Sequence, residues 1–106
     1  MNYIDAYESD YGKVITLPFG STLRIILEEN PSTGFRWQVE DKSSSCLNLL
    51  THEFYANKEY AIGATGTEVF YFEPARPGRC LLFLKLLRSW EGDKSIIKRF
   101  RITVII

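Results

Sequence analysis

Short apolar stretches with turn residues between them occupy most of this chain, and they constrain its fold more than any other feature. The stretches are Val14 to Leu17, Thr22 to Glu28, Phe35 to Val39, Leu47 to Tyr55, Thr67 to Phe72, Cys80 to Leu87 and Phe100 to Ile106. Val, Ile, Thr, Phe and Tyr are frequent in them, and these residue types favour a pleated, half-buried surface. About seven short strands with turns between them predict an all-β sandwich or barrel.

Alternation within the stretches supports strands over helices. Leu23, Ile25 and Leu27 share one face of the second stretch, and their neighbours lie on the other. Only Cys80 to Leu87 has the pattern of a buried helix, and the Pro77-Gly78 pair before it fits a turn that enters a strand better.

Length and composition bound the remaining possibilities. The chain has 106 residues, of which 45% are hydrophobic, so we expect a single folded domain over residues 1–106. No apolar run approaches the ~18 residues that a membrane-spanning helix needs. The segment from Met1 to Lys13 lacks the basic and then apolar layout of a secretory signal. The sequence as it stands therefore predicts a cytoplasmic protein, or a vesicular or secreted one if a leader was trimmed.

The charge balance argues against nucleic acid or a membrane as the partner. The chain has 13 basic and 13 acidic residues, so its formal net charge is zero. The second half is more basic than the first, which leaves open a patch that binds an acidic protein or RNA. We interpret Lys94, Lys98, Arg99 and Arg101 instead as the solvent-exposed face and ends of one strand.

Residues for catalysis or metal binding are scarce. His52 is the one histidine, and nothing near Cys46 or Cys80 suggests a nucleophile loop. These residues are too few for a zinc site, and the Gly63 to Gly66 segment lacks the lysine of a phosphate-binding loop. The sequence predicts that the protein is not an enzyme and uses no cofactor or metal.

The two cysteines leave two possibilities open. Cys80 lies in a dense apolar run, and we interpret it as a buried thiol. A single bridge from Cys46 to Cys80 that joins two sheets is the less favoured alternative.

Three connecting segments have unusual compositions. The first, Asn30 to Gly34, contains a proline that stiffens it and a glycine that can adopt a positive φ. The second, Ile62 to Thr67, places small residues between two glycines, so its backbone can approach another surface closely. The third, Arg88 to Gly92, carries an indole at a polar loop tip, and Trp and Arg often anchor interfaces. An indole folded back onto the core is the alternative for Trp90.

In this order, the three segments resemble the chagasin-type inhibitors of cysteine peptidases. That family carries an Asn-Pro-Thr-Thr-Gly loop, a Gly-x-Gly-Gly loop and an Arg-Pro-Trp loop. The counterparts here are Asn30 to Gly34, Gly63 to Gly66, and Arg88 to Trp90. The segments Gly34-Phe35-x-Trp37 and Gly66-Thr67-Glu68-x-Phe70 extend the resemblance, which covers essentially the whole chain.

The resemblance implies an immunoglobulin-like sandwich of about seven or eight strands with three binding loops at one end. The middle loop would enter the cleft of a papain-like cysteine protease, and the other two loops would flank it. The chain would then be a reversible, non-covalent inhibitor that binds as a monomer in a 1:1 complex. The protease-binding residues that the resemblance implies are Asn30, Pro31, Ser32, Thr33, Gly34, Ile62, Gly63, Ala64, Thr65, Gly66, Arg88 and Trp90.

Three positions depart from the family pattern. Ser32 replaces a threonine and keeps its hydroxyl. Thr65 replaces a glycine, and a positive φ there would strain it by ~1–3 kcal/mol. Ser89 replaces a proline, which loosens the third loop by about 0.4–1 kcal/mol. The alternative function is an immunoglobulin-like module that binds a partner other than a protease through the same loops.

Overall fold

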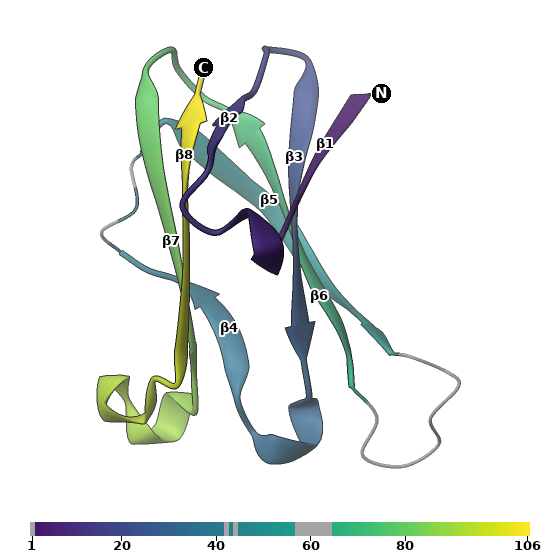
Figure 1. Cartoon of the computed structure of the whole chain (residues 1–106), viewed down its shortest axis with the longest axis vertical. Helices are drawn as coiled ribbons and strands as arrows, with labels where there is room; N and C mark the ends of the chain where they lie inside the picture. Colours follow the sequence, from purple (N-terminus) through teal and green to yellow (C-terminus); the bar gives the residue numbers. More distant parts are fainter. Residues whose placement is uncertain (1, 42, 44, 57–64) are drawn as a thin grey trace.

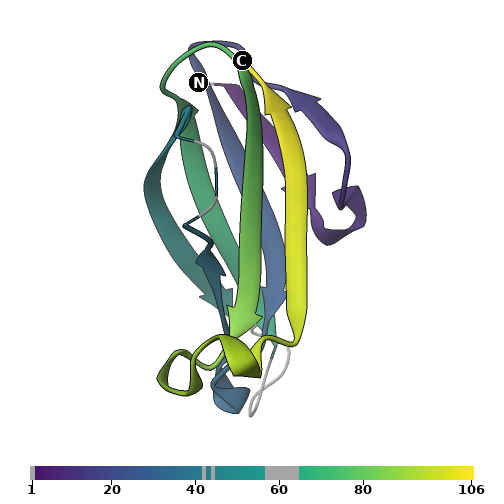
Figure 2. The same ribbon diagram turned by 90° about the vertical axis from the view of Figure 1, so that its left-hand side faces the viewer.

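Two four-stranded sheets pack face to face in the computed structural model, which describes residues 2–41, 43, 45–56 and 65–106 (Figures 1 and 2). In one sheet the strand order is β1-β3-β6-β5, and in the other it is β2-β8-β7-β4. The strands are β1 (Asn2–Tyr7), β2 (Val14–Thr16), β3 (Ser21–Glu29), β4 (Arg36–Val39), β5 (Leu47–Ala56), β6 (Gly66–Pro74), β7 (Arg79–Leu87) and β8 (Lys98–Ile105). The prediction of an all-β, immunoglobulin-like sandwich is confirmed.

The core lies between the two sheets and is built from the alternating residues of the strands. Leu23, Ile25 and Leu27 of β3 are fully buried, as their shared face predicted. The segment from Cys80 to Leu87 is a strand and not a helix, because alternate residues enter the core and Leu81 lies exposed between them. The buried side chains of the second sheet include Cys80, Leu82, Leu84, Phe100, Ile102 and Val104.

Strand β1 is the element that the sequence patterns missed. It pairs in parallel with β3, and Asp5 forms a two-point ion pair with Arg24 of that strand at 2.7 and 2.9 Å. Ala6 is buried in the core, whereas Tyr3 and Tyr7 are exposed. The acidic and aromatic residues of this segment hide its alternation, and it becomes a strand because β3 offers it a free edge.

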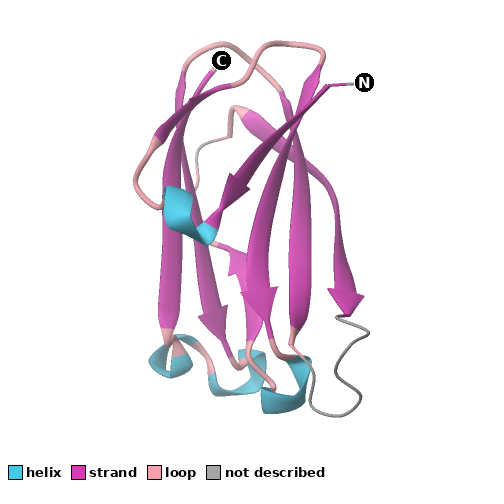
Figure 3. Cartoon of the chain, turned by 45° about the vertical axis from the view of Figure 1, so that its right-hand side comes forward, coloured by secondary structure: helices cyan, strands magenta, loops and turns pink. Residues whose placement is uncertain are grey.

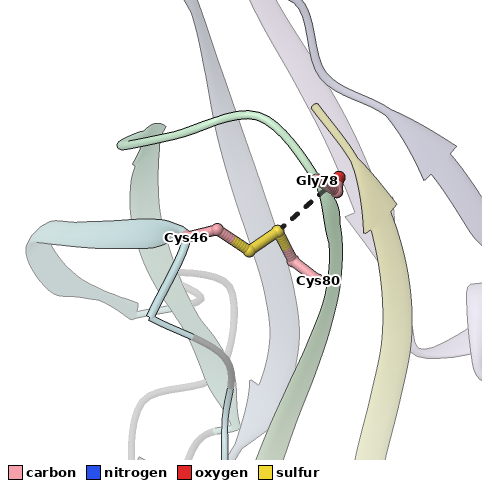
Figure 4. Close-up of a disulfide and its surroundings, with 3 residues drawn as sticks. All are labelled: Cys46, Gly78 and Cys80. Atoms are coloured by element: carbon pink, nitrogen blue, oxygen red, sulfur yellow. Dashed lines mark hydrogen bonds between the residues drawn. A yellow bond between two sulfur atoms is a disulfide. The ribbon is translucent and has the colours of Figure 1, made fainter.

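A disulfide joins Cys46, directly before β5, to Cys80 of β7, so it links the two sheets (Figure 4). The two Cα atoms lie 6.1 Å apart, within the range of disulfide bridges. The interpretation of Cys80 as a free thiol is therefore wrong, although its burial is confirmed. Sequence spacing could not reveal the pairing, because only the packing of the sheets brings residues 34 positions apart into contact.

The basic residues of the second half lie in solvent, as expected. Lys94, Lys98, Arg99 and Arg101 are all exposed, and Lys98 lies 3.5 Å from the carboxylate of Glu8. Lys94 belongs to a short 3-10 helix, Asp93–Ser95, that precedes β8. In the described part of the chain, no helix is long and apolar enough to cross a membrane.

Candidate functional site

Strand pairing brings the ends of the three predicted loops to one end of the sandwich. Glu29, before the first loop, pairs with Gly66, which ends the second loop. Arg36, after the first loop, pairs with Leu87, which precedes the third loop. Figures 1 and 3 show the short helices Pro31–Thr33 and Ser89–Glu91 at this same end. Ile62, Gly63 and Ala64 of the predicted site lie outside the described residues.

The first loop is a 3-10 turn held by its own side chains. Asn30 precedes Pro31–Thr33 in an extended conformation, and its Oδ1 accepts the backbone N–H of Ser32 at 3.2 Å. Gly34 closes the turn with a φ of 82°, the left-handed conformation that favours glycine. Its N–H donates to the carbonyl of Pro31 at 3.0 Å. The loop therefore has its shape before any partner binds.

The two hydroxyls of the first loop are not free donors. The Ser32 hydroxyl donates to Asn30 Oδ1 at 2.6 Å, and the Thr33 hydroxyl donates to the Asn30 carbonyl at 2.7 Å. Both residues are exposed or half-exposed, so their oxygens can still accept hydrogen bonds from a partner. The Ser32 hydroxyl stabilises the turn through its hydrogen bond to Asn30, and another hydroxyl residue at this position could form the same bond.

The third loop contacts the first directly. Arg88 Nε donates to the carbonyl of Thr33 at 3.1 Å, and its guanidinium lies 4.4 Å from the ring centroid of Phe35. The Trp90 ring lies against Gly34, yet 70% of Trp90 is exposed. The indole therefore lies on the surface and packs against Gly34. The alternative of an indole buried in the core is wrong.

Ser95 provides a support for the third loop that the sequence patterns did not indicate. Its hydroxyl oxygen accepts the N–H of Arg88 at 3.0 Å and donates to the carbonyl of Gly92 at 2.7 Å. Lys85 also holds Asp93 at 2.8 Å, and this hydrogen bond lowers the pKa of the Asp93 carboxyl. These contacts hold the third loop from its C-terminal side.

Gly34 is the position where a single methyl group would disturb both loops. A Cβ there would overlap with Cη2 of Trp90 and lie 3.2 Å from Cζ2, and the positive φ would strain it. For the protease inhibitor that the resemblance implies, we expect Gly34→Ala to raise the inhibition constant about three- to fivefold, the equivalent of about 1 kcal/mol. The matched control is Gly20→Ala, because Gly20 has a φ of 92° with nothing near its Cβ position. Equal inhibition constants for both variants would contradict this role of Gly34.

Thr65 and Gly66 are the part of the second loop that the structure describes. A Cβ at Gly66 would overlap with the ring of Phe54 and lie 2.5 Å from the carbonyl of Tyr55, so only glycine fits there. The φ of Thr65 includes an atom of residue 64, which lies outside the described residues, so the strain considered for Thr65 remains a prediction.

Beneath the loops lies a group of buried charges that the sequence reading missed. Glu29 and Glu68 are each only 2% exposed, and both lie next to Arg36. Strand alternation could have indicated the burial of Glu29, because Glu29 continues the inward series of Leu23, Ile25 and Leu27. The same alternation separates the buried Glu29 from the exposed Glu28.

Burial raises the pKa of the Glu29 carboxyl, and the nearby Glu68 carboxylate acts in the same direction. The N–H of Trp37 and the guanidinium of Arg36 oppose this shift. Because the folded chain holds this proton more tightly than the unfolded chain, the contribution of Glu29 to stability is present at low pH. It is lost as the pH rises through the raised pKa.

The arrangement is suited to binding a protein surface. It combines an exposed indole, a guanidinium and two hydrogen-bonded turns on a rigid sandwich, and Trp and Arg are typical anchors of interfaces. His52 is half-exposed and bonded to Glu68, which agrees with a surface residue that has a partner. In the part of the chain that the structure covers, no group of three or more His, Cys, Asp or Glu residues could hold a metal ion.

Fold and loops together define an immunoglobulin-like sandwich that carries a binding surface at one end. The family model for the chagasin family peptidase inhibitor I42 matches residues 16–104. The chain thus belongs to the chagasin family of peptidase inhibitors.

Individual relatives agree with this assignment. Chagasin of Trypanosoma cruzi is 27% identical over 95 residues, which are 86% of either chain. The crystal structure of the cysteine protease inhibitor EhICP2 from Entamoeba histolytica superposes with a TM-score of 0.87 at 21% identity, over 99% of this chain and 96% of that one. PbICP-C, in its complex with falcipain-2, has a TM-score of 0.66 at 15% identity, over 99% of this chain and 98% of that one.

Proposed function

We propose that this chain inhibits papain-like cysteine proteases by docking its three-loop end into the active-site cleft. Membership of the chagasin family supports inhibition, and the complex of PbICP-C with falcipain-2, a papain-like protease, supports this class of target. The observation that carries the proposal is the Trp90 indole, 70% exposed and supported by Gly34. A large exposed indole held in one place is suited to anchoring an interface.

Inhibition by this surface is steric and reversible. The first and third loops are joined by the hydrogen bond from Arg88 to Thr33, so they dock as one unit. Because the first and third loops are already ordered, they lose little conformational entropy on binding. An interface of about 800 Å² per partner is then sufficient for tight binding. The inhibitor needs no chemistry of its own, and no covalent bond is formed.

The residues assigned to protease binding remain predictions. The contacts within the described residues place Asn30 to Gly34 beside Arg88 and Trp90, with Thr65 and Gly66 at the same end. In the proposed complex, Trp90 and Arg88 contact one wall of the cleft. Ser32 and Thr33 of the first loop, which lies directly beside Arg88 and Trp90, contact the protease next to them.

Titration of active papain with the purified chain tests the proposal. We expect residual activity on a fluorogenic peptide to fall with a stoichiometry of 1:1 and to recover on dilution. Trypsin, a serine protease, serves as the control and should be unaffected. If papain keeps full activity at about 10 µM inhibitor, the affinity is too weak for an inhibitor of this enzyme. A loop-dependent complex with a different protein would then favour the alternative of a binding module without a protease target.

A further inference from the structure

Four polar side chains, one from each of four strands, meet directly below the first and second loops. They are Glu29 of β3, Arg36 of β4, His52 of β5 and Glu68 of β6, and we call them the carboxylate clamp. Strands β3 and β4 flank the first loop, and β5 and β6 flank the second loop. Each strand that enters or leaves these two loops therefore contributes one member.

Glu29 closes the base of the first loop. Strands β3 and β4 belong to different sheets, so no backbone ladder joins them. Oε1 of Glu29 instead accepts the N–H of Trp37 at 2.7 Å, and Oε2 accepts Nε of Arg36 at 3.0 Å. The indole of Trp37 adds a bond to the Glu28 carbonyl at 2.9 Å. Side-chain hydrogen bonds thus join β3 to β4, as backbone hydrogen bonds join neighbouring strands within each sheet.

Glu68 connects this base to the second loop. Its Oε1 lies 2.8 Å from Nδ1 of His52, and its Oε2 lies 3.5 Å from Nη2 of Arg36. Within the described residues, that Oε2 makes no hydrogen bond, so its charge is balanced by Arg36. Glu68 is two residues from Gly66, where β6 begins. Arg36 therefore lies between the two carboxylates and links one sheet to the other.

Two buried carboxylates are a poor source of stability, and in some proteins such groups fix one arrangement of the chain. Apolar residues at positions 29 and 68 would continue the core series of β3 and β6 without desolvating any charge. We propose that the carboxylate clamp fixes the first loop relative to Gly66, where β6 begins, and that this positioning is required for tight protease binding. This inference depends on the proposed function.

Glu29 and Glu68 are the positions to test, because neither carboxylate is accessible to a protease. Glu29→Gln and Glu68→Gln preserve shape and remove charge, so any change in inhibition acts through other residues. We expect either variant to raise the inhibition constant for papain about fivefold. The double variant should not raise it much further, because both carboxylates act through Arg36. Glu73→Gln, an exposed position on the same strand β6, is the matched control and should leave inhibition unchanged.

The pH profile separates positioning from a general loss of structure. Gln at position 29 mimics the protonated, uncharged carboxyl. The carboxylate that it replaces faces Arg36 and Glu68, His52 contacts Glu68 from the other side, and Glu28 and Lys98 line the same hollow. The ratio of the inhibition constants of Glu29→Gln and parent should therefore fall toward one as the pH falls through the raised pKa of the Glu29 carboxyl. The ratio cancels the pH dependence of papain itself. A ratio that stays constant as the pH is lowered, while both proteins stay folded, would count against the clamp.

Amide hydrogen exchange of the free chain tests the clamp without a protease. The N–H groups of Gly34 and Trp37 should exchange faster in both variants than in the parent and in Glu73→Gln, at equal global stability. Unchanged inhibition constants in both clamp variants would overturn the inference. If the parent does not inhibit at all, the proposed function fails, and exchange alone decides whether the clamp fixes the first loop. Unchanged exchange would then overturn it.

Discussion

Trp90→Ala is expected to raise the inhibition constant for a papain-like protease at least about tenfold, the equivalent of about 1.4 kcal/mol or more. Trp90 is 70% exposed in the free chain, so its removal exposes no core and should leave the fold intact. What is lost is an exposed indole at the loop end, the group that rests on Gly34. The measurement is a titration of papain with parent and variant under identical conditions.

The control for this prediction is Phe19→Ala. Phe19 is 58% exposed and lies between β2 and β3, at the end opposite the loops. Its truncation removes a comparable exposed aromatic ring and should leave inhibition unchanged. If Trp90→Ala and the parent inhibit equally, the indole is not an anchor, and the proposed orientation of the complex is wrong.

Reduction of the Cys46–Cys80 bridge is expected to lower the free energy of unfolding by about 3–4 kcal/mol. The bridge closes a loop between residues 34 positions apart, and opening it increases the entropy of the unfolded chain. Urea denaturation with and without a reductant measures this difference without changing any side-chain volume. Coincident midpoints under the two conditions would show that the bridge contributes nothing to stability.

Inhibition provides a second measurement on the reduced chain. The bridge lies near the start of β5 and the start of β7, far from the loop end (Figures 1 and 4). The inhibition constant should therefore stay the same wherever the reduced chain remains folded. This matters because cytosolic thiol buffers reduce most disulfides. In such a reducing environment, we expect the chain to keep its inhibition constant without the bridge.

The fold was predictable because strand alternation is a local property. Seven of the strands appear as apolar stretches with turn residues at their ends, and the inward positions of β3 follow from a period of two. Strand β1 was missed because its residues are mixed in polarity and it depends on the edge of β3. The two cysteines allowed one bridge only, but the sequence did not show that they come close enough to form it, because that depends on the packing of the two sheets.

At the loop end, the sequence predicted the local character of each loop but not the contacts between loops. Asn30, Pro31 and Gly34 specify a stiff turn by local chemistry, and the structure shows that turn. Spacing along the chain could not show that Arg88 reaches the Thr33 carbonyl, or that the Trp90 ring rests on Gly34. Those contacts depend on the pairing of β4 with β7, which places residues more than fifty positions apart side by side.

The sequence by itself determined an alternating chain of strands with three unusual turns, because hydrophobic period and turn chemistry act over a few residues. Only the tertiary structure decided that Glu29, Arg36, His52 and Glu68 meet below those turns. The physical reason is that a buried carboxylate is tolerated only where a partner from another strand balances it, and strand order supplies that partner.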